Sequence, residues 1–336
     1  MAVTIDEISA LTEKLYIKLI ADNVFNSNAL LARMHKRGMK TDGGTAIHTP
    51  LMYARVGASG AIRGFEAMNI DADDQFTAVD FGYKEYYAAI VVSRREVLLK
   101  SGVSAKVKHL SAKAMAAEMT LRDIMGTGLQ SDGTTTRLIE GLDAATQNTT
   151  VYPNTNAGDG SLGIDPSVET WWQSGFRGAA TALIAGVTLG TDGSNAARIF
   201  QVFTGRLTEA PFGPTIYITT QDGFDRFHAG TVTISHSGVT PSGGQQFTDP
   251  HLASLGFETL LFRGKPIVVD SHVTGNRIFG LNENFLDLMS HEDENFTFSP
   301  YREPVNQKAM VGYVFWTGNL VCNNRRYQGL ITDYAA

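Results

Sequence analysis

The chain has 336 residues, of which 43% are hydrophobic, and it carries 28 Lys and Arg against 34 Asp and Glu, a formal net charge of -6. This length and apolar content suffice for two domains or one large one. The acidic balance excludes a generally basic surface that coats nucleic acid, although it allows a local basic patch. The single cysteine, Cys322, excludes an intrachain disulfide.

The N-terminal region carries acids and lysines throughout, so we expect no signal peptide there. No uncharged apolar run approaches the roughly 18 residues of a membrane span, and we expect a soluble protein made inside the cell. Apolar residues over 5–20 are spaced for a short amphipathic helix. A basic cluster follows, which is either a solvated surface or an arm lying against anionic material: His35, Lys36, Arg37 and Lys40.

Two runs, residues 47–53 and 79–92, alternate in the manner of strands, and a glycine-rich, acidic stretch at 57–77 lies between them. We predict a long two-stranded arm. An isolated hairpin is barely stable in water, and the adjacent sequence offers no obvious partner for the aromatic residues of this one. A second copy of the protein would cover them; the alternative is a lid over an active site in the same chain. These aromatic residues are Tyr53, Phe65, Phe76, Phe81, Tyr83, Tyr86 and Tyr87.

The stretch from Ser104 to Met125 has apolar residues at alternating steps of three and four, which predicts a helix. Ser104 is a candidate N-cap, and Gly126 and Gly128 are expected to end the helix. We interpret it as a spine laid across a sheet; the alternative is an ordinary core helix. Its apolar stripe consists of Val103, Val107, Leu110, Ala114, Ala117, Leu121 and Ile124.

The remainder of the chain mixes helices and strands, and strands predominate in the last third. Residues 126–166 have loop composition and are expected to be the seam between two domains. Trp171 and Trp172 are expected to nucleate the second core. The pattern favours an α+β fold. The strands are expected at 214–219, 256–262, 266–270, 277–281, 286–289, 296–298 and 309–320.

The sequence contains no phosphate-binding loop, dinucleotide fingerprint, nucleophile elbow or zinc motif. Three loop histidines, at 228, 236 and 251, could converge on a metal, but nothing in their spacing favours it. The acidic run at 291–294 is interpreted as a solvated turn, and Cys322 as a small core residue. We therefore expect no catalytic residue, cofactor or metal, and hence no enzyme.

The order of these parts resembles the tailed-bacteriophage major capsid protein, with the Hong Kong 97-like fold. The segment from Gly256-Phe257 through Gly264-Lys-Pro266 to Asp270 is similar to a hairpin of that family. Residues 277–282 and 319–326 are similar to its closing segments. The likeness spans nearly the whole chain, and the joint order carries it rather than a single motif.

The resemblance implies a division into an N-terminal arm, an extended loop, a peripheral domain with the spine helix and long strands, and an axial domain. These correspond to residues 1–45, residues 46–92, residues 93–135 with 284–318, and residues 136–283 with 319–336. It also implies that the extended loop contacts a neighbouring subunit through Tyr53, Arg55, Arg63, Phe65, Phe76, Phe81 and Tyr83, and that the spine helix packs through Val107, Leu110, Leu121 and Ile124.

The implied function is structural: pentamers and hexamers that close into an icosahedral shell around double-stranded DNA. The implied location is the virion, after assembly in the cytoplasm of a host bacterium. The implied partners are further copies of the chain, a portal protein, a separate scaffolding protein and, in some members, a decoration protein. Lys36, Arg37 and Lys40 would face the packaged DNA without reading its sequence. No membrane is expected.

Three other functions stay open from the sequence: an encapsulin-like nanocompartment shell, a soluble enzyme with residues 57–77 as a lid, and a phage tail or receptor-binding subunit, which the spine helix disfavours. The stretch 57–77 contains no lysine, so we do not expect the lysine–asparagine cross-link that some family members form from the loop tip. Gly102 and Gly126 could let the spine bend differently in pentamers and hexamers.

Overall fold

A computed structural model describes residues 20, 23–25, 28–68, 70, 73–99, 103–154, 160–190, 193, 195–235, 259–305 and 307–335. Residues 5–19 of the helix expected over 5–20 lie outside the described residues, as do Gly102, His236, His251 and the Gly256-Phe257 pair. In the described part of the chain, no helix is both long enough and apolar enough to cross a membrane.

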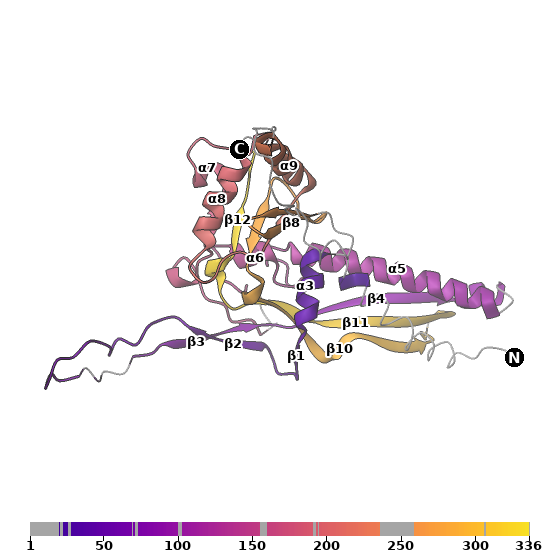
Figure 1. Ribbon diagram of the computed structural model, residues 1–336. Helices are drawn as coiled ribbons and strands as arrows, with labels where there is room; N and C mark the ends of the chain where they lie inside the picture. The colour runs from indigo at the N-terminus through magenta and orange to yellow at the C-terminus, as the bar shows by residue number, and fades with distance from the viewer. Residues whose placement is uncertain are drawn as a thin grey trace.

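Within the described residues, one sheet has four strands in the order β1–β10–β11–β4 (Figure 1). β10 (Leu286–Arg302) and β11 (Ala309–Cys322) form a long antiparallel hairpin with Leu286 opposite Cys322. β4 (Lys84–Ser93) continues the sheet antiparallel to β11, and β1 (Met39–Thr41) runs parallel to β10. The two strands expected at 286–289 and 296–298 are therefore one strand, interrupted by bulges between Ser290 and Thr297.

A 27-residue helix, α5 (Val103–Leu129), runs along the β4 side of this sheet and is about 40 Å long (Figure 1). Its buried side matches the predicted stripe, because Ala114, Ala117 and Leu121 lie in the core while Leu110 and Ile124 pack at its edge. The side chain of Val107 lies outside the described part. The described part of the helix therefore packs through the predicted stripe, in agreement with a spine laid across a sheet.

The prediction that Gly126 and Gly128 end the helix is wrong, because both lie inside α5. These glycines permit close packing instead. A β-carbon at Gly128 would lie 2.5 Å from the hydroxyl oxygen of Tyr86, and one at Gly126 would meet the His272 ring at 2.4 Å. The Tyr86 hydroxyl accepts the Ile139 backbone N–H at 2.9 Å, and burial raises the pKa of Tyr86 to about 12.

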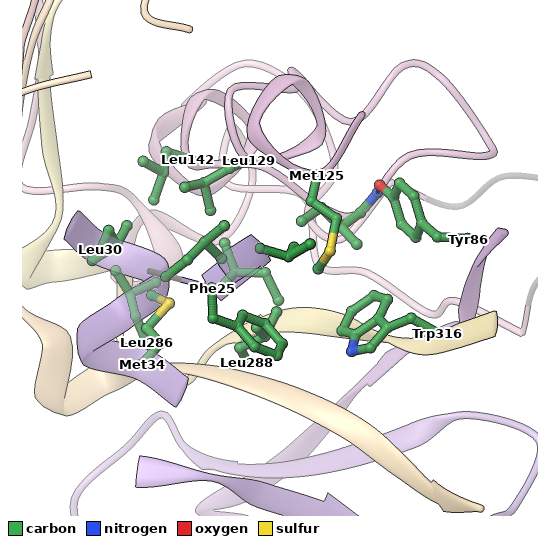
Figure 2. Close-up of a cluster of buried hydrophobic side chains, with 14 of the residues drawn as sticks. Phe25, Leu30, Met34, Tyr86, Met125, Leu129, Leu142, Leu286, Leu288 and Trp316 are labelled. Carbon is green, nitrogen blue, oxygen red and sulfur yellow. Dashed lines mark hydrogen bonds between the residues drawn. The ribbon is translucent and has the colours of Figure 1, made fainter. Parts of the chain in front are cut away.

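The two halves of the chain share one core where the N-terminal helix α3 (Ala29–Arg37) meets the end of α5. Figure 2 shows Leu30 and Met34 facing Leu286 and Leu288, with Phe25 between them and Met125. Asn28 caps α3 through its side-chain oxygen, which accepts the Leu30 backbone N–H at 2.9 Å. The arm before β1 is thus fixed to the body by apolar contacts and a capped helix.

The second sheet has six strands among the described residues, in the order β5–β12–β9–β6–β8–β7. Phe200, Phe203, Tyr217 and Phe227 are among the aromatic residues of the core that α8 and α9 build against it. At the β7–β8 turn, Arg263 and Gly264 have φ of 50° and 75°, as a two-residue hairpin turn of this twist requires. The bounds are β5 (Phe176–Gly178), β6 (Ile216–Thr219), β7 (Thr259–Phe262), β8 (Lys265–Val269), β9 (Ile278–Leu281), β12 (Gly329–Ile331), α6 (Leu142–Thr146), α7 (Ala180–Leu183), α8 (Ala196–Leu207) and α9 (Gln221–Ser235).

Among the described residues, Arg325 is the largest buried cation, with 1% of its surface exposed. Its guanidinium donates to the backbone oxygens of Ala145 and Trp172, each at 2.9 Å, and to that of Gln147. It also lies 4.7 Å from the centre of the Tyr152 ring, and burial lowers the pKa of Arg325 to about 10. One side chain thereby joins three segments between the two sheets.

We expect Gly141→Ala to destabilise the chain by about 3 kcal/mol or more, because an added β-carbon would meet backbone rather than a movable side chain. It would lie 2.3 Å from the Ser131 oxygen and 2.4 Å from the Ser131 nitrogen. Chemical denaturation measures the change. Gly205→Ala is the control, since a β-carbon there meets nothing within 4 Å; equal effects of the two would contradict the close approach.

We expect Cys322 to resist alkylation in the folded chain. Its side chain is fully buried, and burial raises the pKa of the thiol to about 12. The reactive thiolate is therefore scarce and inaccessible at pH 8. Mass spectrometry after iodoacetamide treatment should show no adduct in buffer and one adduct in denaturant. Rapid modification in buffer would contradict this burial.

Candidate intersubunit surface

A two-stranded ribbon carries the extended loop. β2 (Ile47–Met52) pairs antiparallel with β3 (Phe76–Phe81), from Ile47 opposite Phe81 to Met52 opposite Phe76. One side of β2 is buried and the other is exposed, as alternation predicts. The run 79–92 is not one strand, because the chain leaves the ribbon at Gly82 and Tyr83 and enters β4 of the four-stranded sheet.

The base of the ribbon packs on its own chain. Phe81 is fully buried with its ring 5.6 Å from that of Tyr152. The Asp80 and Leu162 backbones exchange two hydrogen bonds of 3.1 and 2.9 Å. These contacts fix the direction in which the loop leaves the body. Farther out, the rings of Tyr53 and Trp171 lie 5.7 Å apart.

Beyond the pair of Met52 and Phe76, the loop extends away from the body (Figure 1). The exposed fraction reaches 109% for Phe65, 90% for Ile70 and 70% for Phe76. Such a density of exposed apolar side chains is unusual for a segment that stays in water. Among the described residues of this distal loop, residues 52–76, the other large apolar side chains that are exposed are Met52, Tyr53, Val56, Ile62 and Met68.

Hydrogen bonds within the distal loop give it a local shape. The Gly57 backbone N–H donates to Asp73 Oδ2 at 2.9 Å and joins the two limbs. Near the tip, the Arg63 backbone N–H donates to Glu66 Oε2 at 3.0 Å around Gly64, whose φ is 64°. These are polar contacts among exposed residues, so they shape the arm without burying its apolar side chains.

The structure divides the predicted contact residues into two groups. Tyr53, Arg55, Arg63, Phe65 and Phe76 are exposed. Phe81 is buried in its own chain, so no part of it is available to a neighbour, and its assignment to an intersubunit contact is wrong. Tyr83 is half-buried, and its hydroxyl lies 2.9 Å from Thr41 Oγ1, which assigns it to the body as well. Alternation alone could not locate the point where the ribbon meets its own core.

The residues of the predicted basic cluster also have different environments. Arg37 lies 3.4 Å from Asp287 and donates to the backbone oxygens of Glu283 and Asn284, so it anchors α3 to the start of β10. Burial raises the pKa of Asp287, and the charge of Arg37 opposes that shift. Lys36 and Lys40 are exposed. The role of Arg37 toward this chain is therefore structural.

A second apolar surface covers the face of the four-stranded sheet that carries the outward side chains of β4. Tyr87 is 62% exposed and Val91 is 44% exposed. The Tyr87 and Tyr313 rings lie 6.3 Å apart, and Tyr313 stacks with Phe315 at 5.7 Å. This surface was not predicted from the sequence, although the alternation of Tyr313 and Phe315 with buried neighbours on β11 indicates it.

Among the described residues, no three His, Cys, Asp or Glu side chains converge in a way that could hold a metal ion. The loop region with His236 and His251 lies outside those residues. The described geometry is thus dominated by exposed apolar surfaces on extended elements.

No family model and no curated protein matches this chain. Solved structures do match it at low identity. A capsid protein of cyanophage A-1(L) aligns with a TM-score of 0.57 and 16% identity over 91% of this chain and 93% of that one. The capsid of a native GTA particle aligns with a TM-score of 0.53 and 11% identity over 92% and 91%. A protein of Gordonia phage Cozz aligns with a TM-score of 0.51 and 12% identity over 90% and 86%. These likenesses, which cover nearly all of both chains, show that the chain has the mixed α+β Hong Kong 97-like capsid fold.

Proposed function

We propose that this chain is a structural shell protein that assembles with copies of itself into pentamers and hexamers of an icosahedral shell. The observation that carries this proposal is the distal loop, whose base is fixed in its own core while its apolar side chains are exposed. Burying one large apolar side chain is worth roughly 1.5–3 kcal/mol. A loop that leaves one copy and lies on the next makes a head-to-tail contact, and such contacts close into rings.

The parts of the fold support an assignment of regions. We assign α5 and the four-stranded sheet to the peripheral domain, and the six-stranded sheet with α8 and α9 to the axial domain that surrounds the symmetry axes. We assign residues 1–45 to the N-terminal arm. Gly126 packs against His272 inside α5, so it serves close packing, and we no longer propose it as a bending point.

We propose double-stranded DNA as the content of the shell, and a portal, a scaffolding protein and a decoration protein as partners in a virion. The same fold would serve a nanocompartment that encloses a protein cargo. The lid alternative has less support, because the distal loop extends away from the body rather than over it (Figure 1).

Expression of the chain alone, followed by size-exclusion chromatography and electron microscopy, tests the proposal. A shell protein should yield closed particles or capsomers, whereas an enzyme should elute as a small oligomer. The ratio of absorbance at 260 and 280 nm of purified particles, before and after nuclease treatment, then separates DNA from a protein cargo. A monodisperse monomer at high concentration, without particles, would contradict the proposal.

Lys36 and Lys40 remain candidates for non-specific contact with packaged DNA, since both are exposed. We expect the Lys36→Ala, Lys40→Ala variant to bind duplex DNA with a salt dependence that is shallower by about two counterions. Filter binding of capsomers across a salt series measures this dependence. An unchanged salt slope for the lysine variant would contradict the DNA contact.

Arg37→Ala should instead lower the stability of the fold by about 1–3 kcal/mol, because it leaves Asp287 buried without its cation.

A further inference from the structure

β4 is a ten-residue edge strand of the four-stranded sheet, without a proline or a bulge. The Arg94 backbone N–H donates to Lys308, in register with the β4–β11 pairing, so even-numbered residues of β4 direct their backbone groups toward β11. The odd-numbered residues, among them Tyr87, Ala89 and Val91, direct theirs outward. In the described part of the chain, no strand pairs with that edge. A long regular edge of this kind is a template for another strand.

A groove of about 490 Å³ lies along this edge, between β4 and α5. Its α5 side is formed mainly by small side chains, including Ala116, Ala117 and Thr120, which leave room for a backbone. Lys113 is the one charged residue among those that line it. A strand added to β4 would thus have α5 over one of its faces, as β4 itself has.

Residues 55–63 of the distal loop have the pattern that this groove would accept. Val56, Ala58, Gly60 and Ile62 are apolar or small, and they alternate with Arg55, Gly57, Ser59, Ala61 and Arg63. The stretch contains no proline. Nine residues of extended chain span about 30 Å, close to the length of β4. Yet no strand forms in 55–63 in the single copy, where a bend joins Gly57 O to the Ser59 N–H at 2.8 Å.

We propose that residues 55–63 of one copy add to the free edge of β4 in a second copy as a fifth strand. Val56, Ala58 and Ile62 then lie under α5 in the groove. Arg55 and Arg63 lie on the opposite face, near the two ends of the added strand, and with Ser59 beside Ala89 either strand direction brings one of them beside Glu85 and the Tyr87 ring, both exposed on β4. The pairing satisfies the outward backbone groups of β4 and straightens the bend at 57–59. This inference rests on the proposed self-assembly, since it names the surface that receives the loop.

Cysteine cross-linking between copies tests the occupant of the edge. Copies with Ala89→Cys are co-assembled with copies carrying Ser59→Cys; both side chains would lie on the same face of the extended sheet. We expect a disulfide-linked dimer on a non-reducing gel, because adjacent strands bring Cα atoms within disulfide range. Cys322 is buried and does not interfere. The control pairs Ser59→Cys with Ala112→Cys, which lies on the exposed side of α5 outside the groove, and should give no dimer.

A second pair of variants tests the groove without altering the strand. Ala116→Arg fills the groove, whereas Ala112→Arg lies one turn earlier on α5, beyond the residues that line the groove. We expect Ala116→Arg to reduce the yield of closed particles at least tenfold with an unchanged melting temperature of the unassembled chain, and Ala112→Arg to assemble normally.

Dimers formed by Ala89→Cys copies alone would show that two β4 edges pair with each other and would overturn the inference. So would closed particles in which Ala89→Cys and Ser59→Cys never cross-link, or normal assembly of Ala116→Arg. Each of these outcomes leaves self-assembly itself intact. Failure of the unmodified chain to form particles or capsomers would instead contradict the proposed function.

Discussion

Replacing Phe65 and Ile70 with serine should reduce the yield of closed particles at least tenfold and leave the folded chain as stable as before. Both side chains are almost completely exposed, with 109% and 90% of their surface accessible, so they contribute nothing to the core of their own copy. If a neighbouring copy buries them, their loss removes roughly 3–6 kcal/mol from each contact. A shell multiplies that loss over every subunit pair. Particle counts by electron microscopy and the melting temperature of the unassembled chain measure the two effects.

Val168→Ser is the matched control, because Val168 is also apolar and 72% exposed but is not part of the distal loop. It should assemble normally. If the double serine variant formed particles of normal yield and robustness, the distal loop would not be the contact that holds copies together. If it melted at a lower temperature, the loop would pack on its own chain instead.

Arg325→Met should cost about 3–5 kcal/mol of folding stability, a large part of the 5–15 kcal/mol available to a typical domain. Methionine keeps the apolar stem but leaves the backbone oxygens of Ala145, Gln147 and Trp172 buried without a donor. Each unsatisfied group costs about 1–3 kcal/mol. Urea denaturation followed by tryptophan fluorescence measures the loss, since Trp172 lies beside the guanidinium.

Arg326→Met controls for the loss of a positive charge at the neighbouring position. The Arg326 side chain is 54% exposed and its carboxylate partner, Glu209, lies 3.6 Å away and is 65% exposed. An exposed pair of this kind contributes little, so we expect a change below about 1 kcal/mol. Equal losses for the two variants would mean that the three carbonyl contacts of Arg325 carry no special stability.

The sequence predicted best those elements in which local pattern and tertiary environment agree. The apolar stripe of α5 was predicted correctly because Ala114, Ala117 and Leu121 pack in one continuous core. The hairpin of β7 and β8 was predicted correctly because its turn needs positive φ at two residues, and one of those residues is Gly264.

The errors arise where a residue has a partner that is distant in sequence. Gly126 and Gly128 read as helix stops, but His272 and Tyr86 occupy the space that a side chain would need. Arg37 read as part of a basic patch, but Asp287 pairs with it from β10. None of these partners can be located by periodicity, because each contact joins residues that are far apart in the sequence. The sequence correctly indicated that apolar side chains of the distal loop are exposed. It could not show that this exposure ends before Phe81, because Phe81 packs on Tyr152, which is distant in sequence.

The unpaired edge of β4 also bears on how the protein must be produced. A newly folded copy presents an open strand edge and an apolar loop at the same time, which is the combination that drives amorphous aggregation when shells nucleate slowly. Recovery of soluble material should therefore fall as the concentration of unassembled copies rises, and rapid nucleation should protect the protein from that loss.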